Sequence, residues 1–357
     1  MKQYNRILTL MIAAALSLCS LTGCGAGVGR TDTAAGETMV SQAETASSGA
    51  ASSVPEEDSA AEQRYSVVCT IFPAYDWMRQ ILGERTEQVD LTLLLDNGVD
   101  LHNYQPTAED IVTIGSCDLF VYVGGESDEW VEDALKEATN PKMKVVNLLE
   151  SIGDQAKEEE LVEGMEGEEE EAGEEEEGPE YDEHVWLSLR NARTLTQILT
   201  DAMKEIDSAN AEGYQSNCDR YTAQLSRLDE EYQAAVEGAS VKTLLFGDRF
   251  PFRYLVDDYG LKYYAAFVGC SAETEASFET VVFLAGKVDE LGLETICTIE
   301  NSDQRIAQTI IDNTAEKNQS ILTMDSLQST TMQDINAGAT YLSAMEQNLE
   351  TLKQALQ

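Results

Sequence analysis

Ser66-Val67-Val68-Cys69-Thr70-Ile71 is a continuous apolar run that Pro73 closes. A run without polar alternation is typical of a strand buried on both faces, as in parallel sheets that helices cover on two sides. From this strand to the C-terminus, short apolar runs alternate with segments of helical periodicity. The alternation predicts an α/β fold with mostly parallel sheets.

A long amphipathic segment at 209–237 divides the chain into two such regions. Its apolar residues recur every three or four positions: Tyr214, Cys218, Tyr221, Leu225, Leu228 and Tyr232. A helix of this length spans roughly 43 Å, which is more than one lobe requires. We therefore expect two doubly wound lobes joined by a long rigid helix. The N-terminal lobe is expected at 65–190, the connecting helices at 191–238 and the C-terminal lobe at 239–357.

The N-terminus has the features of an export signal. Lys2 and Arg6 precede an apolar stretch at 7–21 that is too short for a comfortable membrane span. The stretch ends in Leu21-Thr22-Gly23-Cys24, which resembles the lipobox of bacterial lipoproteins, whose cysteine is lipidated. A plain signal peptide with an incidental cysteine is the alternative.

We expect a signal peptide at 1–24, lipidation of Cys24 and a flexible linker at 25–64, which is rich in Ala, Ser, Thr and Gly. These features predict a monomer attached by a lipid anchor to the extracytoplasmic face of the cell membrane.

The net charge of −43 argues against nucleic acid as a partner, because phosphate binding requires a basic surface. Much of this charge lies in a glutamate-rich stretch that has no basic residue between Glu158 and Glu183. Such a composition cannot bury much apolar area. We therefore expect an acidic disordered loop at 155–183 within the N-terminal lobe.

The chain has only two histidines, and both lie in polar segments. His102 lies in Asp100-Leu101-His102-Asn103-Tyr104-Gln105-Pro106-Thr107, after a predicted strand. His184 lies in Asp182-Glu183-His184-Val185-Trp186. Ligands of open α/β sheets bind at the carboxyl ends of the strands. Three carboxylates are also predicted at strand ends, which gives five candidates for one metal site: His102, His184, Asp248, Asp325 and Glu300.

Each carboxylate has a structural interpretation as well. Asp248 precedes a predicted helix and is a plausible N-cap, Asp325 suits a turn, and Glu300 suits a hydrogen-bonded strand end. Two imidazoles and two carboxylates suit Zn²⁺ or Mn²⁺, whereas a set without thiolates argues against Cu⁺ or a cysteine-type zinc site. Four protein ligands would close the site, as expected for carriage of the ion rather than catalysis.

Several segments together resemble the solute-binding lipoproteins of bacterial zinc and manganese ABC importers, the cluster A-I metal-binding family. The resemblance runs from Ser66 to the C-terminus. The family pattern Asp-Pro-His-x-Tyr-x-Pro-Thr corresponds to 100–107, and Asp-Pro-His-Val-Trp-Leu to 182–187; Leu101 and Glu183 replace its prolines. Further matches are Tyr259-Gly260-Leu261, Glu275-Ala276-Ser277 and Tyr341-Leu342-Ser343-Ala344-Met345-Glu346-Gln347-Asn348-Leu349.

The resemblance implies a metal site in the cleft between the lobes, with His102, His184, Asp248 and Asp325 as its four ligands and Glu300 as the alternative fourth. Zinc-specific members commonly have histidine at the third position, where this chain has Asp248. Zinc is the expected ion and manganese the alternative.

The expected function is capture of the metal outside the cytoplasmic membrane and its delivery to an ABC permease. A surface adhesin and a zinc hydrolase are the alternatives. The chain has none of the motifs HExxH, GxSxG or a phosphate loop, so we expect no enzyme.

Overall fold

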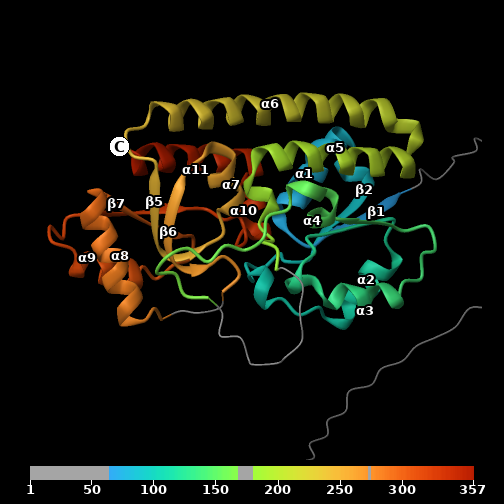
Figure 1. Cartoon of the computed structure of the whole chain (residues 1–357). Helices are drawn as coiled ribbons and strands as arrows, with labels where there is room; N and C mark the ends of the chain where they lie inside the picture. Colours follow the sequence, from blue (N-terminus) through green and yellow to red (C-terminus); the bar gives the residue numbers. More distant parts are fainter. Residues whose placement is uncertain (1–63, 168–179, 272–274) are drawn as a thin grey trace, which may run out of the picture. The chain divides into compact units, whose positions relative to one another are not determined.

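The structure is a computed structural model that describes residues 64–167, 180–271 and 275–357 (Figure 1). The predicted signal peptide with Cys24, the linker up to residue 63 and positions 168–179 of the acidic stretch lie outside the described residues. None of the described helices is both long and apolar enough to cross a membrane.

The first lobe is built on a parallel sheet of four strands in the order β2-β1-β3-β4. These strands are β1 (Tyr65–Cys69), β2 (Val89–Leu93), β3 (Leu119–Tyr122) and β4 (Lys144–Asn147). Its helices are α1 (Phe72–Leu82), α2 (Ala108–Ser116), α3 (Trp130–Lys136) and α4 (Leu148–Ser151). Val67, Val68 and Cys69 are all buried in β1, which confirms the strand with two buried faces.

The second lobe repeats the arrangement with a parallel sheet in the order β6-β5-β7-β8. Its strands are β5 (Thr243–Phe250), β6 (Lys262–Val268), β7 (Thr295–Ile299) and β8 (Ser320–Met324). Its helices are α7 (Arg253–Tyr259), α8 (Phe278–Leu291), α9 (Arg305–Asn313), α10 (Met332–Asn336) and α11 (Tyr341–Ala355). The predicted pair of α/β lobes is confirmed.

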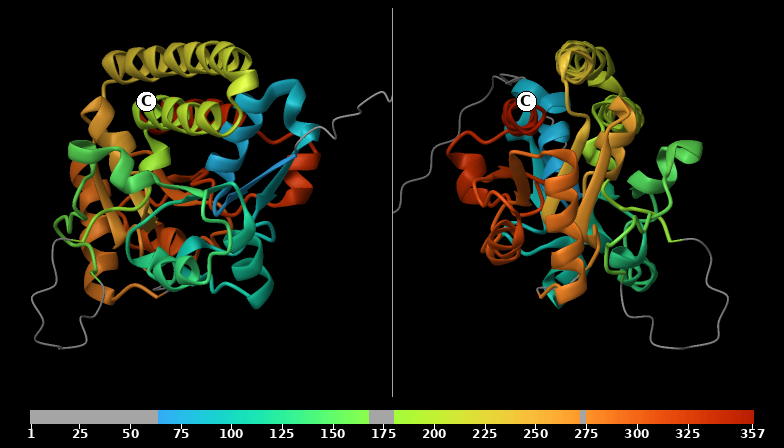
Figure 2. Two further views of the ribbon diagram at one scale, coloured as in Figure 1. Left: turned by 90° about the vertical axis from the view of Figure 1, so that its right-hand side faces the viewer. Right: turned by 60° about the vertical axis from the view of Figure 1, so that its left-hand side comes forward.

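Two antiparallel helices, α5 (Leu189–Ile206) and α6 (Ala211–Gly238), connect the lobes, and α6 runs above both of them (Figures 1 and 2). α6 has 28 residues and is about 42 Å long. In the first lobe, the Asn217 side chain donates to the carbonyl of Ile81, 2.9 Å away. In the second lobe, the buried Tyr232 hydroxyl donates to the carbonyl of Met345, 2.7 Å away. The helix is therefore attached to both lobes.

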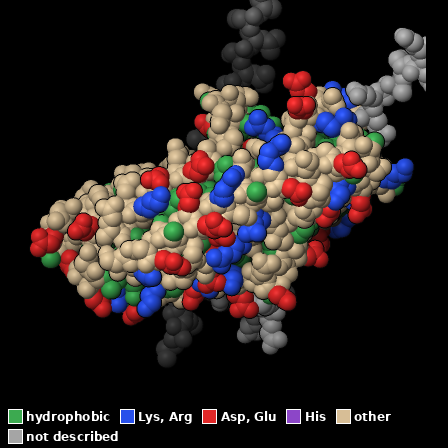
Figure 3. Space-filling model, turned by 90° about the horizontal axis from the view of Figure 1, so that it is seen from above, with side chains coloured by type: hydrophobic (Ala, Val, Ile, Leu, Met, Phe, Trp, Pro, Cys, Tyr) green, Lys and Arg blue, Asp and Glu red, His purple; other side chains and the backbone are tan. Residues whose placement is uncertain are grey.

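The outer face that carries α6 is polar. Lys and Arg side chains alternate there with Asp and Glu (Figure 3). Side chains of both charges are therefore interspersed on this face.

Asp248 was predicted to follow the end of a strand. In the structure, strand β5 continues through Gly247 and Asp248 to Phe250. The register shifts between Phe246 and Arg249, after which pairing with β6 resumes. Gly247 lies against α9, where an added Cβ would approach the Cα of Ala307 to 2.5 Å. Asp248 consequently lies inside an irregular strand, and the N-cap of α7 is Phe252. The predicted N-cap role of Asp248 was wrong.

The described flanks of the acidic stretch also differ from the expected disorder at 155–183. Glu158 pairs with Tyr181 in an antiparallel bridge, and Glu166 pairs with Phe267 in a parallel bridge. The amide of Glu166 donates to the carbonyl of Ala266 over 2.9 Å. Because β6 is an edge strand, its free backbone groups can bind this segment whatever its side chains are.

The turn after β3 is held by a buried carboxylate, that of Asp128. Asp128 ends a short 3₁₀ turn, Glu126–Asp128, and is 3% exposed. Its Oδ2 accepts hydrogen bonds from the amides of Val123 and Gly124 at 2.8 and 3.0 Å. Burial raises the pKa of Asp128 to about 6, although these amides oppose the shift.

This pKa predicts a pH-dependent stability that Asp128→Asn removes. A folded-state pKa above the unfolded value of about 3.9 means that the contribution is full below about pH 4 and is lost as pH rises through about 6. Between pH 4 and 7 the wild type should lose up to about 3 kcal/mol relative to the variant. Urea denaturation of both proteins across this range measures the difference, and parallel pH profiles would contradict it.

Candidate metal centre

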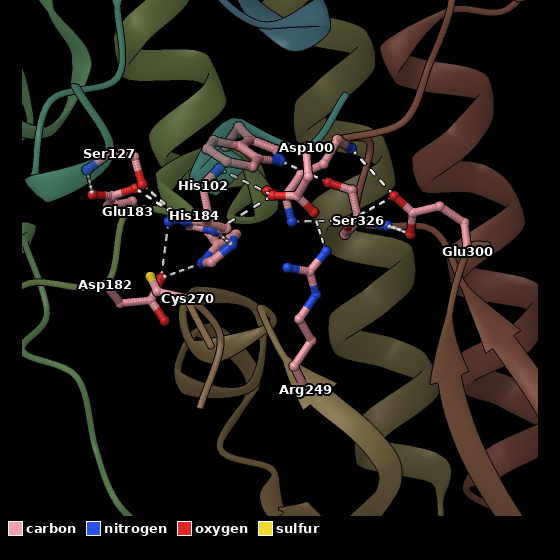
Figure 4. A network of polar contacts seen from close by, with 12 residues as sticks. Asp100, His102, Ser127, Asp182, Glu183, His184, Arg249, Cys270, Glu300 and Ser326 are labelled. Carbon is pink, nitrogen blue, oxygen red and sulfur yellow. Dashed lines mark hydrogen bonds and ion pairs between the residues drawn. The ribbon is translucent and has the colours of Figure 1, made fainter. Parts of the chain in front are cut away.

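His102 is placed by the short 3₁₀ turn Leu101–Asn103 after β2. Asp100 caps this turn, because its Oδ1 accepts the amide of His102 at 3.1 Å. The ring Nδ1 lies 2.7 Å from the hydroxyl oxygen of Ser127, and the side chain is 6% exposed. The ring is thus fixed from behind, with Nε2 facing inward (Figure 4).

His184 is placed in the same way by a different segment. It precedes the 3₁₀ turn Val185–Leu187 and is fully buried. Oδ1 of Asp182 accepts its backbone amide at 2.8 Å and lies 3.0 Å from its ring Nδ1. A carboxylate on Nδ1 fixes the tautomer that leaves the Nε2 lone pair free, as in carboxylate–histidine–zinc groups.

The two Nε2 atoms face each other at 3.2 Å. Two nitrogens bound to one tetrahedral zinc at 2.0–2.1 Å would lie about 3.3 Å apart. The chain therefore brings its two histidines together at a separation that suits a shared ion, which the sequence predicted. Burial and the neighbouring His184 lower the pKa of His102 to about 3, so its ring stays neutral over the physiological range.

Cys270 is the third member of this group. The donor atoms of His102, His184 and Cys270 all lie within 4.8 Å of one another. Among the residues that the structure describes, they form a cluster of three side chains that could bind a metal ion. Cys270 follows β6 in a tight turn, where its amide lies 3.4 Å from Oε1 of Glu159. Burial raises the pKa of its thiol well above the ordinary value.

Gly269 allows the turn to approach the buried ring. A Cβ at this position would lie 2.9 Å from the carbonyl oxygen of Phe250 and 3.0 Å from Cε1 of His184. The absence of a side chain thus lets the turn pack directly against the imidazole and carry Cys270 to it.

A small cavity of about 210 Å³ opens beside the group, and four of its eight lining residues are glutamates. Its lining includes His102, Glu159, Glu183 and Cys270. Oε1 of Glu183 accepts the amide of Ser127 at 2.8 Å, but the buried Oε2 has no hydrogen-bond partner. Burial raises the pKa of Glu183 to about 7, against the hydrogen bonds from Ser127.

The carboxylate of Asp248 lies outside this group and is used by the backbone. Its oxygens accept the amides of Arg249 and Ile299 at 2.9 and 3.4 Å. The next residue, Arg249, forms an ion pair with Asp100 across the two lobes (Figure 4). Burial alone would raise the pKa of Asp100, but the guanidinium and His102 lower it. Asp248 and Glu300 line a separate cleft of about 480 Å³ next to this ion pair.

Glu300 and Asp325 hold the loop that follows β8. Oε1 and Oε2 of Glu300 accept the hydroxyl and amide of Ser326 at 2.6 and 2.7 Å. Oδ1 of Asp325 accepts the amide of Leu327 at 2.8 Å, and burial together with Glu300 raises its pKa to about 6. The carbonyl of Ser326 in turn accepts the indole N–H of Trp186 at 2.8 Å. In this structure, both carboxylates therefore stabilise the loop that binds Trp186, which lies two residues after His184.

Sequence reasoning missed Cys270 because no second cysteine lies near it. The predicted ligand set contained no thiolate, whereas a thiol lies beside the imidazoles in the structure. The pair Gly269-Cys270 at the end of the strand Lys262–Val268 was the available signal. It follows a strand end, as Glu300 and Asp325 also do in agreement with the prediction, and a glycine there permits close packing.

Comparison with known proteins gives a consistent result. Residues 67–355 match the family ZnuA, described as zinc-uptake complex component A, periplasmic. The zinc-binding lipoprotein AdcA of Streptococcus pneumoniae is 31% identical over 296 residues, covering 82% of this chain. The high-affinity zinc uptake system protein ZnuA of Bacillus subtilis is 30% identical over 292 residues, covering 81% of this chain and 87% of that protein. The chain spans only 56% of AdcA, or about half its length.

Solved structures agree in fold. The Zn(II)-bound ZnuA-like domain of S. pneumoniae AdcA superposes with a TM-score of 0.64 at 28% identity, covering 82% of this chain and 99% of that domain. The metal-dependent lipoprotein YcdH of B. subtilis gives 0.66 at 28% identity, with the same coverage. A laminin-binding adhesin of Streptococcus agalactiae gives 0.66 at 22% identity, a likeness of fold alone.

The fold is thus that of ZnuA-like solute-binding proteins. The chain belongs to the ZnuA family of zinc-uptake components.

Two glycine substitutions test the packing of the turn against His184. Gly269→Ala should lower the free energy of unfolding by about 1–3 kcal/mol, because the added methyl group meets a backbone oxygen and a buried ring. Gly286→Ala, in α8, has no atom within 4 Å of the added carbon and should be neutral or stabilise by up to about 1 kcal/mol. Denaturant titration without metal measures both, and equal effects would refute the close approach.

Proposed function

We propose that this protein captures Zn²⁺ outside the cytoplasmic membrane and delivers it to an ABC permease. The observation that carries the proposal is the pair of buried imidazoles, whose Nε2 atoms face each other at 3.2 Å while both Nδ1 atoms are bound from behind. This is a preorganised nitrogen site for a borderline metal ion. The names of the relatives AdcA and ZnuA, which refer to zinc binding and zinc uptake, support zinc as the ion.

The proposed ligands from the histidine pair are His102 and His184. The sequence also predicts Asp248 and Asp325 as ligands, with Glu300 as the alternative, and these remain predictions. In this structure their carboxylates bind the backbone or neighbouring side chains. Manganese is the alternative ion.

Anchoring is part of the proposal. The lipobox-like sequence at Cys24 and the name of the AdcA relative as a lipoprotein support attachment to the outer face of the membrane by a lipid. The anchored protein is proposed to be a monomer. Such an anchor would keep the captured ion close to a permease partner.

Removal of either imidazole should abolish tight zinc binding. His102→Ala and His184→Ala should each lower zinc affinity by more than the roughly 10–100-fold that loss of an outer partner costs. Isothermal titration of metal-free protein with zinc, and separately with manganese, measures the effect. Asp133→Asn is the control, because this exposed carboxylate pairs only with Lys136 on α3. Unchanged affinity in both histidine variants would overturn the site.

A milder effect is expected from the hydroxyl behind His102. Ser127→Ala removes the oxygen 2.7 Å from Nδ1 and should weaken zinc binding by about 10–100-fold. Ser116→Ala is the matched control, since its hydroxyl bonds only to its own helix. Competition with a zinc-binding dye resolves the two variants, and equal affinities would show that Ser127 does not orient the ring.

The two alternatives make different predictions. An adhesin should bind its matrix protein after the metal has been removed. A zinc hydrolase should hydrolyse a substrate, and His184→Ala should abolish that activity. We expect neither activity, because the role proposed here is carriage of the ion.

A further inference from the structure

A sulfur atom lies close to the imidazole pair, at a position that suits a metal. In a tetrahedral zinc site, Zn–N bonds of 2.0–2.1 Å and a Zn–S bond of 2.3 Å place nitrogen and sulfur about 3.6 Å apart. The donor atoms of His102, His184 and Cys270 already lie within 4.8 Å of one another. A shift of about 1 Å, or a rotation of the cysteine side chain, therefore brings all three onto one ion.

The surroundings of the three donors point to a cation as well. Oε2 of Glu183 is buried in the same cavity without a hydrogen-bond partner, and the residue is 2% exposed. It lies 3.5 Å from Nδ1 of His102, behind the ring. A buried carboxylate oxygen with no donor is costly unless positive charge lies nearby. An ion held by the imidazoles would supply that charge.

The residue after the expected third ligand, Asp248, is positively charged. Arg249 directly follows Asp248 in β5, and its guanidinium reaches across to Asp100, which caps the turn of His102. The guanidinium is already paired with Asp100, and both oxygens of Asp248 already accept backbone amides. The second lobe therefore offers an ion-paired arginine on β5 and a thiol after β6.

From this geometry we propose that the Cys270 sulfur is the third protein ligand of the metal, so that the site holds zinc through two imidazoles and one thiolate. The inference rests on the proposed function and names the donor set of that same site. On binding, the S–H bond breaks, a Zn–S bond forms and the proton leaves to solvent. No oxidant or reductant is required.

The donor set also decides between the two candidate ions. A thiolate is a soft ligand that suits Zn²⁺, whereas Mn²⁺ prefers carboxylate and water oxygens. The site should therefore discriminate against manganese, and this discrimination should depend on the sulfur. The cavity that Glu159 and Glu183 line lies beside His102 and Cys270.

X-ray absorption at the zinc edge of the zinc-loaded protein tests the bond directly. A sulfur scatterer at about 2.3 Å is expected in the wild type and should disappear in Cys270→Ser. The cobalt-substituted protein should show a sulfur-to-metal charge-transfer band that Cys270→Ser lacks. Cys218→Ala is the matched control, because this buried cysteine lies on α6 and should leave both signals unchanged. A spectrum with only nitrogen and oxygen scatterers would overturn the proposal.

Affinities separate this inference from the proposed function. Cys270→Ala should weaken zinc binding by more than about 100-fold, whereas Asp248→Asn and Asp325→Asn should change it by less than about 10-fold. Cys270→Asp should narrow the preference for zinc over manganese. If the histidine variants lose zinc while Cys270→Ala retains it, the carrier function stands and the thiolate ligand fails. If the wild type binds no zinc, both fail.

Discussion

Both imidazole rings are held by hydrogen bonds at Nδ1, and the site depends on this constraint. Ser127 lies behind His102 and Asp182 behind His184, so each ring presents Nε2 to the other. A ring that could rotate would pay conformational entropy on binding an ion, whereas these rings are already oriented. The buried carboxylate Asp128 stabilises the turn that carries Ser127, which extends the constraint to the strand β3.

The second lobe reaches the same rings through the backbone of the His184 segment. The hydroxyl of Tyr254 donates to the carbonyl of Asp182 at 2.8 Å, and the hydroxyl of Tyr341 donates to the carbonyl of Trp186 at 2.6 Å. The Trp186 indole donates to the loop that Glu300 holds. Through this loop, Glu300 supports the segment that carries His184 (Figure 4).

Asp248, the expected third ligand, and Cys270, the thiol beside the imidazoles, lie on neighbouring strands or turns of the second lobe. Arg249 beside Asp248 pairs with Asp100, which leaves the β5 side of the junction with a neutralised ion pair. The turn after β6 instead brings the thiol of Cys270 to the imidazoles. Gly269 permits this because it has no side chain between the turn and the ring of His184. A donor set of two nitrogens and one sulfur favours zinc in a family whose relatives are named for it.

The sequence by itself determined the lobes, the helix α6 and the two histidines, because apolar periodicity and the rarity of histidine are local properties of the chain. The cap of α2 is local as well, since Thr107 and Asp110, three residues apart, bond reciprocally. Only the tertiary structure decided which strand-end residues meet, because the register shift in β5 turns Asp248 towards backbone amides, while the turn after β6 brings Cys270 to the rings. A shift of one or two residues in a strand changes which side chain faces a site, and periodicity cannot detect it.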